Sequence, residues 1–192
     1  MSVPRHVLFL IASSRAAGHV GNTETLARQA AAALPPGTRQ TWLRLADLDL
    51  PPFVDQRHTV GSYPAPEGGL KTLADALLDC TDLVAVSPVY WFSLPAPLKL
   101  ALDHWSGLLR VPGLDFKARM AGKRFWAVST SGHRAKAQPM FDSLALCAEF
   151  MGMRWMPPLW GGGGAPGAVL ADATAQADRK STRLNSSHSQ QS

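Results

Sequence analysis

The chain has 192 residues, two cysteines and a formal net charge of +5. This length fits a single domain with a substantial core. Its positive residues are scattered and form no basic run with interleaved aromatic residues, which disfavours a nucleic-acid-binding protein. No apolar run is long enough to span a bilayer, and no signal peptide precedes the first strand, so the sequence predicts a cytoplasmic protein without a membrane partner.

The two cysteines, Cys80 and Cys147, lie far apart and outside any spacing typical of a metal site. We therefore expect two buried free thiols rather than a disulfide or a metal centre.

The N-terminal stretch predicts a strand, a polar loop and a helix. Six apolar residues from Val7 to Ala12 suit a strand buried on both faces. The helix is expected to run from about Thr23 to Leu34, with Asn22 as its N-cap. A helix N-terminus after a strand is an anion site, most often for phosphate, although a polar turn that caps an ordinary helix is the alternative. Neither of the usual glycine-rich phosphate fingerprints occurs here.

The segment from Ser-Ser-Arg to Gly-Asn-Thr, residues 13–23, resembles the flavin-phosphate loop of the flavodoxin-like NAD(P)H-dependent FMN and quinone reductases. It departs from the family pattern by the longer segment Ala16–Val20. The resemblance implies that the phosphate is bound by Ser13, Arg15, Gly21, Asn22 and Thr23.

Downstream of Pro35-Pro36-Gly37, apolar patterns typical of strands and helices alternate. This alternation predicts strands at residues 38–45, 83–86, 125–128 and 154–160, and helices at residues 70–79, 97–109, 141–151 and 169–179.

Three further segments are predicted to be irregular. Residues 47–69 are rich in proline and glycine and form either a functional element, such as a lid or a subunit contact, or a plain surface excursion. Residues 111–123 are expected to form a solvated connection, and residues 161–164 a flexible loop.

Repeated strand-helix alternation implies an α/β fold in which helices cover both faces of a parallel sheet. The resemblance implies a flavodoxin-like three-layer sandwich with a five-stranded sheet of order 2-1-3-4-5. The loops after the first, third and fourth strands would then meet at one crevice. The flavodoxin-like FMN-binding domain is expected to span residues 1–179, because residues 180–192 resemble a translated sequencing-adapter artefact.

A second loop places three aromatic residues, Tyr90, Trp91 and Phe92, after the third predicted strand. Aromatic rings offer flat surfaces for a planar ligand, although they could also cover a helix end or form an oligomer contact. The segment from Pro88 to Asp103 resembles the isoalloxazine loop and following helix of the same reductases. The resemblance implies that the flavin ring lies along Pro88, Val89, Tyr90, Trp91 and Phe92, with the Trp91 and Phe92 N–H groups facing its polar edge.

The third loop, residues 129–133, is similar to the Ser/Thr-x-x-Gly loop of the family. A lone loop histidine is more often solvated than functional, but His133 is the one titratable side chain expected near the ring. The resemblance implies that the pocket is completed by Ser129, Thr130, Ser131, Gly132 and His133.

The resemblance implies a noncovalently bound FMN that is reduced by NADPH or NADH and reoxidised by a quinone, azo, nitro or flavin acceptor. No catalytic acid or base is then required, because the cofactor carries the hydride chemistry. A homodimer or homotetramer is expected. The alternatives are a flavodoxin-type electron carrier, which the basic charge disfavours, and a flavodoxin-like interaction protein. A classical dinucleotide-binding dehydrogenase fits least well, because its glycine fingerprint is missing.

Overall fold

The structure, a computed structural model, describes residues 4–171 of the chain. The strands are β1 (His6–Ile11), β2 (Arg39–Arg44), β3 (Asp82–Val86), β4 (Arg124–Ser131), β5 (Arg154–Trp155) and β6 (Leu159–Gly162). The helices are α1 (Asn22–Ala32), α2 (Gly68–Asp79), α3 (Ala96–Leu108), α4 (Phe116–Met120) and α5 (Arg134–Phe150), with short 3₁₀ turns η1 (Leu45–Asp47) and η2 (Ala168–Ala171).

The strands form one parallel sheet of order β2-β1-β3-β4-β5, which confirms the predicted fold class and strand order. A sixth strand, β6, also pairs with β4, beyond the point where β5 ends. The predicted last strand at residues 154–160 is therefore two short strands that pair with successive parts of β4. Pro157 and Pro158 lie between them and lack the N–H groups that a continuous strand would need.

The central strands end in register, and this register creates the site. Ile11 of β1 pairs with Val86 of β3, and Val86 pairs with Val128 of β4. Backbone hydrogen bonds continue one residue further, from the Ala12 N–H to the Val86 oxygen and from the Ser87 N–H to the Val128 oxygen. The loops that follow these three strands therefore begin side by side.

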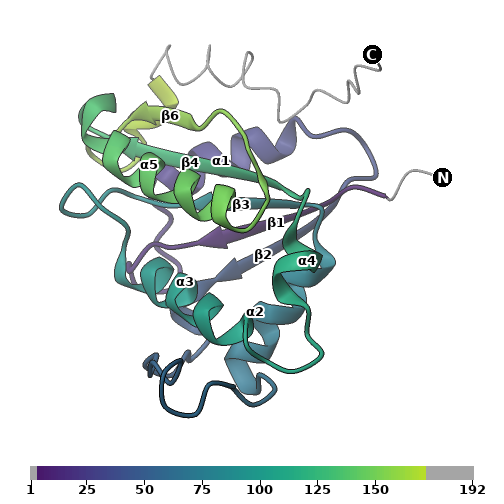
Figure 1. Ribbon diagram of the computed structural model, residues 1–192. Helices are drawn as coiled ribbons and strands as arrows, with labels where there is room; N and C mark the ends of the chain where they lie inside the picture. The colour runs from purple at the N-terminus through teal and green to yellow at the C-terminus, as the bar shows by residue number, and fades with distance from the viewer. Residues whose placement is uncertain (1–3, 172–192) are drawn as a thin grey trace.

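The helices are divided unequally between the two faces of the sheet (Figure 1). The apolar side chains of α1 pack on Val7, Phe9 and Ile11 of β1, whereas α2, α3, α4 and α5 cover the face that carries Leu8 and Leu10. Successive β1 side chains thus enter opposite cores, which explains why this strand is apolar at every position from Val7 to Ile11.

Several predicted boundaries were wrong. β4 extends to Ser131, so residues 129–131 belong to a strand rather than to a loop. α5 begins at Arg134 and continues through Pro139, well before the predicted start at residue 141. The predicted connection at residues 111–123 contains the short helix α4, and Gly161 and Gly162 of the predicted flexible loop lie in β6.

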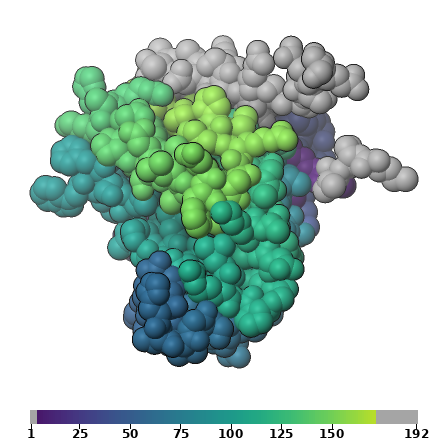
Figure 2. Space-filling view, in the orientation of Figure 1, coloured from purple at the N-terminus to yellow at the C-terminus, as the bar shows by residue number. Residues whose placement is uncertain are grey.

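Residues 48–67 form a surface excursion anchored on α3, at the end of the molecule away from α5 and β6 (Figure 2). His104 Nε2 lies 2.8 Å from the Pro51 oxygen; because a carbonyl only accepts, this nitrogen carries the hydrogen. Tyr63 packs over α3 at Gly107, where an added Cβ would lie 3.1 Å from the tyrosine ring. None of these loop residues lines the cavity described below.

Both cysteines are free, as predicted, but only Cys80 is buried, whereas Cys147 is partly exposed. Within residues 4–171 no helix is long and apolar enough to cross a membrane. The predicted helix at 169–179 begins in the 3₁₀ turn η2 and otherwise lies outside the described residues, as does the segment 180–192.

Candidate functional site

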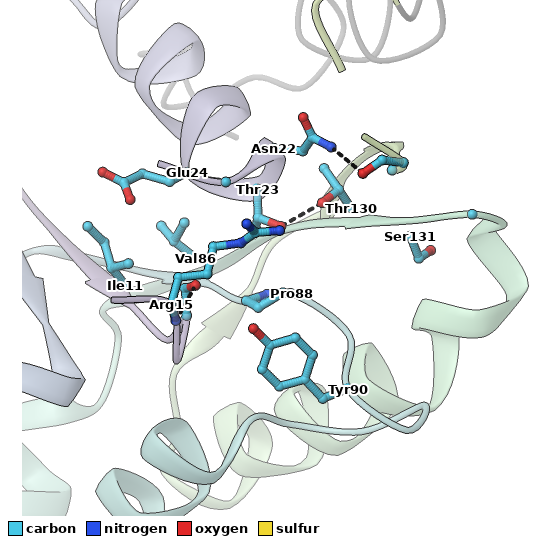
Figure 3. A pocket seen from close by; sticks show the side chains of 15 residues that line it. Ile11, Arg15, Asn22, Thr23, Glu24, Val86, Pro88, Tyr90, Thr130 and Ser131 are labelled. Carbon is cyan, nitrogen blue, oxygen red and sulfur yellow. Dashed lines mark hydrogen bonds between the residues drawn. The ribbon is translucent and has the colours of Figure 1, made fainter. Parts of the chain in front are cut away.

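The three loops that follow β1, β3 and β4 meet around a cavity of about 280 Å³ (Figure 3). The cavity lies at the carboxyl ends of the strands, where open α/β sheets bind their ligands. It is lined by Ile11, Ser13, Arg15, Gly21, Asn22, Thr23, Glu24, Val86, Pro88, Tyr90, Thr130, Ser131, Gly132, Gly163 and Gly164.

The start of α1 supplies hydrogen-bond donors to this cavity. The N-cap is Gly21 rather than the predicted Asn22, and it has no side chain to cap the first turn. Among the described residues, the N–H groups of Asn22, Thr23 and Glu24 donate no hydrogen bond, whereas the next N–H bonds to the Gly21 oxygen. These free donors, together with the positive end of the helix dipole, suit an anionic group.

Thr23 links this helix start to the neighbouring strand. Its hydroxyl oxygen lies 2.6 Å from that of Thr130 in β4, and both side chains are almost fully buried. One of the two hydroxyls donates to the other, so the recipient retains a hydrogen for a ligand.

Asn22 does not act as a cap because its side chain is occupied elsewhere. Its amide group donates to the Gly164 and Ala165 oxygens, and its Oδ1 accepts from the Gly167 N–H at 2.8 Å. Asn22 thereby holds the segment after β6, two of whose glycines line the cavity. It shapes a wall of the cavity through its neighbours.

Two charged residues also line the cavity. Arg15 extends along the loop toward Thr23 (Figure 3), and a Cβ added to Gly21 would lie 3.2 Å from its Nε atom. Glu24 is paired with Arg28, one helical turn further along α1, at 2.6 Å. Arg15 thus provides positive charge beside the open first turn, while the Glu24 charge is neutralised by its helix neighbour.

The aromatic loop after β3 is a tight turn. Tyr90 and Ser93 exchange two backbone hydrogen bonds, and the central residues Trp91 and Phe92 have φ angles of 49° and 62°. Such a turn favours Asn-Gly, because side chains with a Cβ are strained in the left-handed region. Trp91 is nevertheless 93% exposed, so its burial does not compensate for the strain. Strain of this kind is retained mainly at functional sites.

The turn divides the predicted ring-binding residues. Pro88 and Tyr90 line the cavity, and Tyr90 directs its hydroxyl into it (Figure 3). Val89, Trp91 and Phe92 instead line an adjoining hollow that shares Ser131 and Gly132 with the cavity. The N–H groups of Trp91 and Phe92 make no hydrogen bond within residues 4–171.

The end of β4 contributes only part of its predicted set. Ser131 accepts a hydrogen bond from Trp160 Nε1 and donates to the His133 oxygen, which fixes its side chain at the rim. Ser129 is fully buried inside β4, and its hydroxyl has no partner among the described residues. His133 is exposed at the start of α5. Neither Ser129 nor His133 lines the cavity.

Sequence reasoning missed five lining residues. Ile11 and Val86 close the floor because their strands end in register, which the hydrophobic runs alone do not reveal. Glu24 lies in the first turn of α1, and it lines the cavity because this turn faces the cavity. Gly163 and Gly164 belong to a glycine run that the sequence did display.

The shifted pKa values of the described chain belong to groups outside the cavity. Burial raises the pKa of Cys80 to about 11. Burial acts to raise the pKa of Asp82, but the hydrogen bonds from Arg124 and Arg5 lower it by more, so the pKa is lowered overall. These groups lie at the opposite, amino-terminal end of the strands and take no part in the site.

Fold and site together define a flavodoxin-like α/β protein with an anion-binding crevice beside exposed aromatic rings. Residues 5–165 match the family model of NADPH-dependent FMN reductases. YwqN of Bacillus subtilis (strain 168), which is named as an NAD(P)H-dependent FMN-containing oxidoreductase, is 30% identical over 158 residues, covering 81% of this chain and 85% of the relative. The chain therefore belongs to the NADPH-dependent FMN reductase family.

Solved structures share the fold. The Trp repressor binding protein from Bacillus subtilis has a TM-score of 0.70 at 24% identity, covering 94% of this chain and 99% of that one. The NAD(P)H:quinone oxidoreductase from Methanothermobacter marburgensis has a TM-score of 0.67 at 16% identity, with both chains covered completely.

Family membership establishes the general activity. This protein is an oxidoreductase that uses FMN and NAD(P)H. The cavity fits such a cofactor in its chemistry, because unpaired N–H groups, an arginine and a threonine hydroxyl surround one end while an aromatic residue flanks the other. When bound there, FMN would supply the hydride and electron-transfer chemistry, and the residues lining the cavity would bind and orient it.

Proposed function

We propose that the cavity at the carboxyl ends of β1, β3 and β4 binds FMN, with the phosphate at the first turn of α1. Ser13, Arg15, Gly21 and Thr23 surround the phosphate, and Asn22 holds the glycine wall beside it. The observation that carries the proposal is the open first turn of α1, whose free N–H groups and neighbouring arginine lie on one cavity.

The polar edge of the flavin ring faces the turn at Trp91 and Phe92. Their N–H groups are available as donors, and Tyr90 closes the space between this turn and the phosphate end. Thr130, Ser131 and Gly132 complete the wall from β4. Gly132 leaves this part of the wall without a side chain, and the space beside its Cα is open, with no atom within 4 Å of where a Cβ would lie.

The protein transfers two electrons from NAD(P)H to a quinone, azo, nitro or flavin acceptor. The nicotinamide releases a hydride, and the acceptor takes up two electrons with protons supplied by that hydride and by water. The chain's own residues bind and orient the reactants, and no side chain needs to gain or lose a proton. The described residues lining the cavity include no histidine, cysteine or paired carboxylates that would favour acid–base or nucleophilic catalysis.

A second copy of the chain is proposed to cover the apolar groove between α3 and α5, giving a homodimer or, through further contacts, a homotetramer. The groove has a volume of about 330 Å³, and Leu146 and Phe150 on its rim are 65% and 60% exposed. Apolar patches of this kind mark interaction surfaces.

We place the protein in the cytoplasm, where its two free cysteines stay reduced.

The test is a spectroscopic titration of the purified protein with FMN, after removal of unbound flavin. We expect a retained flavin spectrum that NADPH or NADH bleaches without oxygen and that a quinone restores. Retention without bleaching would favour the electron-carrier alternative. Failure to retain FMN would contradict the proposed function.

A further inference from the structure

A hollow of about 270 Å³ adjoins the cavity and lies between the aromatic turn and the start of α5. Ser131 and Gly132 line both spaces, so a molecule in the hollow lies beside a molecule in the cavity. The hollow is therefore placed for a second reactant rather than for a distant effector. Its other lining residues are Val89, Trp91, Phe92 and Lys136.

Two aromatic rings form the apolar wall of this hollow. Trp91 and Phe92 are 93% and 54% exposed, and both occupy the strained left-handed conformation described above. The fold therefore holds two large rings at the surface in a backbone geometry that disfavours them. Exposed aromatic rings on a tight turn offer flat surfaces on which a planar ligand can stack.

Lys136 supplies the charge of the hollow. It is the third residue of α5, it is exposed, and its ammonium group makes no ion pair or hydrogen bond within residues 4–171. No carboxylate lies among the lining residues, so the positive charge is not neutralised locally. The N-terminal end of the α5 dipole adds to it. A flat ligand in this hollow would gain from an anionic substituent.

We propose that the hollow is the acceptor subsite and that Lys136 makes the enzyme prefer planar aromatic acceptors that carry an anionic group, such as sulfonated or carboxylated quinones and azo compounds. The proposal rests on the proposed function, because it assigns a substrate class to the same site. Trp91 and Phe92 stack on the ring of the acceptor, and Lys136 pairs with its anion. The phosphates of a nicotinamide nucleotide are a second source of anionic charge, and the experiment separates the two.

The first measurement is equilibrium dialysis of the FMN-loaded protein with naphthalene-2-sulfonate and with the neutral naphthalene-2-sulfonamide. Neither compound accepts electrons, so binding is read without turnover. We expect Lys136→Met to weaken sulfonate binding about fivefold relative to the sulfonamide, which is the upper range for a partly exposed ion pair. Added salt should reduce the preference for the sulfonate over the sulfonamide in the native protein but not in Lys136→Met. The matched control is Lys71→Met, an equal charge change on α2.

A second variant separates stacking from charge. Trp91→Asn suits the left-handed backbone and removes the ring, so it should weaken both naphthalene ligands by the same factor. An unchanged preference for the sulfonate in Lys136→Met, in protein that retains FMN, would overturn the proposal while leaving the proposed function intact. Loss of FMN binding in the native protein would instead contradict the proposed function.

Kinetics then distinguish the two anionic sources. With 1,4-naphthoquinone-2-sulfonate and unsubstituted 1,4-naphthoquinone as acceptors, Lys136→Met should raise KM for the sulfonated quinone alone, and the KM values for NADPH and for NADH should both stay constant. A rise in KM for NADPH, for NADH or for both, without a change in the KM ratio between the two acceptors, would assign Lys136 to the nucleotide and overturn the proposal.

Discussion

The hydroxyls of Thr23 and Thr130 lie 2.6 Å apart and join the first turn of α1 to the end of β4. The two residues are separated by more than one hundred positions, yet both line the same cavity. Their contact fixes the helix start, with its free N–H groups, against the strand that forms the opposite wall. It links the proposed phosphate-binding end of the site to the sheet.

Replacing Thr23 or Thr130 with valine should separate the effect of each hydroxyl on FMN binding from its effect on the stability of the protein. Both Thr23→Val and Thr130→Val remove the contact and should lower the free energy of unfolding by about 1 kcal/mol. Only Thr23→Val also removes the hydroxyl that we propose binds the phosphate, so it should weaken FMN binding about tenfold more than Thr130→Val does. Flavin fluorescence titrations and urea unfolding measure these effects. Thr72→Val on α2, whose hydroxyl bonds within its own helix, is the control.

The strained turn predicts a trade-off between stability and function. Replacing Trp91 with Asn and Phe92 with Gly gives the residues that this turn favours, so the free energy of unfolding should rise by about 1 kcal/mol. The same variant should bind flat acceptors more weakly, because both rings are lost. Urea unfolding and acceptor KM measure the two effects. A less stable variant would show that the rings stabilise the fold and would contradict their assignment to ligand binding.

Asn22 should act through the wall that it holds. Asn22→Ala removes three hydrogen bonds to residues 164–167 and should lower the free energy of unfolding by about 2 kcal/mol. Amide hydrogen exchange in residues 161–167 should become faster, while exchange in β1 and β3 should change only by the loss of global stability. Equal acceleration throughout the sheet would mean that the wall is not locally anchored by this side chain.

The buried carboxylate of Asp82 predicts the pH dependence of stability. It accepts hydrogen bonds from Arg124, Arg5, Trp126 and Thr81, and its pKa is lowered from the ordinary 3.8. Because the folded-state pKa lies below the unfolded value, the group contributes stability above about pH 4 and loses it as the pH falls toward the folded-state pKa. Asp82→Asn should lower the free energy of unfolding by about 2 kcal/mol at pH 7, and the stability of this variant should fall less steeply as the pH is lowered from 7 to 3.

Urea unfolding between pH 3 and pH 7 tests this dependence. Asp75→Asn, which removes an exposed ion pair with Lys71 on α2, should leave the pH dependence of the free energy of unfolding unchanged. If the free energy of unfolding falls equally steeply with decreasing pH in the native protein and in Asp82→Asn, other carboxylates control acid unfolding.

The strand-helix alternation predicted the parallel sheet, because the central strands contain uninterrupted apolar runs and are followed by helices. The strand order was expected from the flavodoxin-like resemblance and not from the apolar pattern. The sequence also located the three loops, since their polar and aromatic residues follow directly after those strands. The boundaries near Ser129 and Phe141 could not be predicted. β4 continues beyond its apolar run because β6 pairs with its last residues, and this pairing brings together segments about thirty positions apart.

The role of Asn22 was also out of reach. An asparagine before a helix ordinarily caps it, but here the helix starts one residue earlier and the side chain turns to a segment more than 140 positions away. Local sequence preference cannot reveal a partner that only the tertiary fold supplies. The aromatic loop was predicted to be exposed, as Trp91 and Phe92 are, but their left-handed backbone conformation could not be predicted from the sequence.

The most direct test of the account compares FMN with riboflavin, which lacks only the phosphate. If the first turn of α1 and Arg15 hold that phosphate, the native protein should bind FMN at least one hundred times more tightly than riboflavin, and Arg15→Met should narrow this gap about tenfold. Equal affinities for the two flavins, or a gap that Arg15→Met leaves unchanged, would contradict the placement of the phosphate in this cavity.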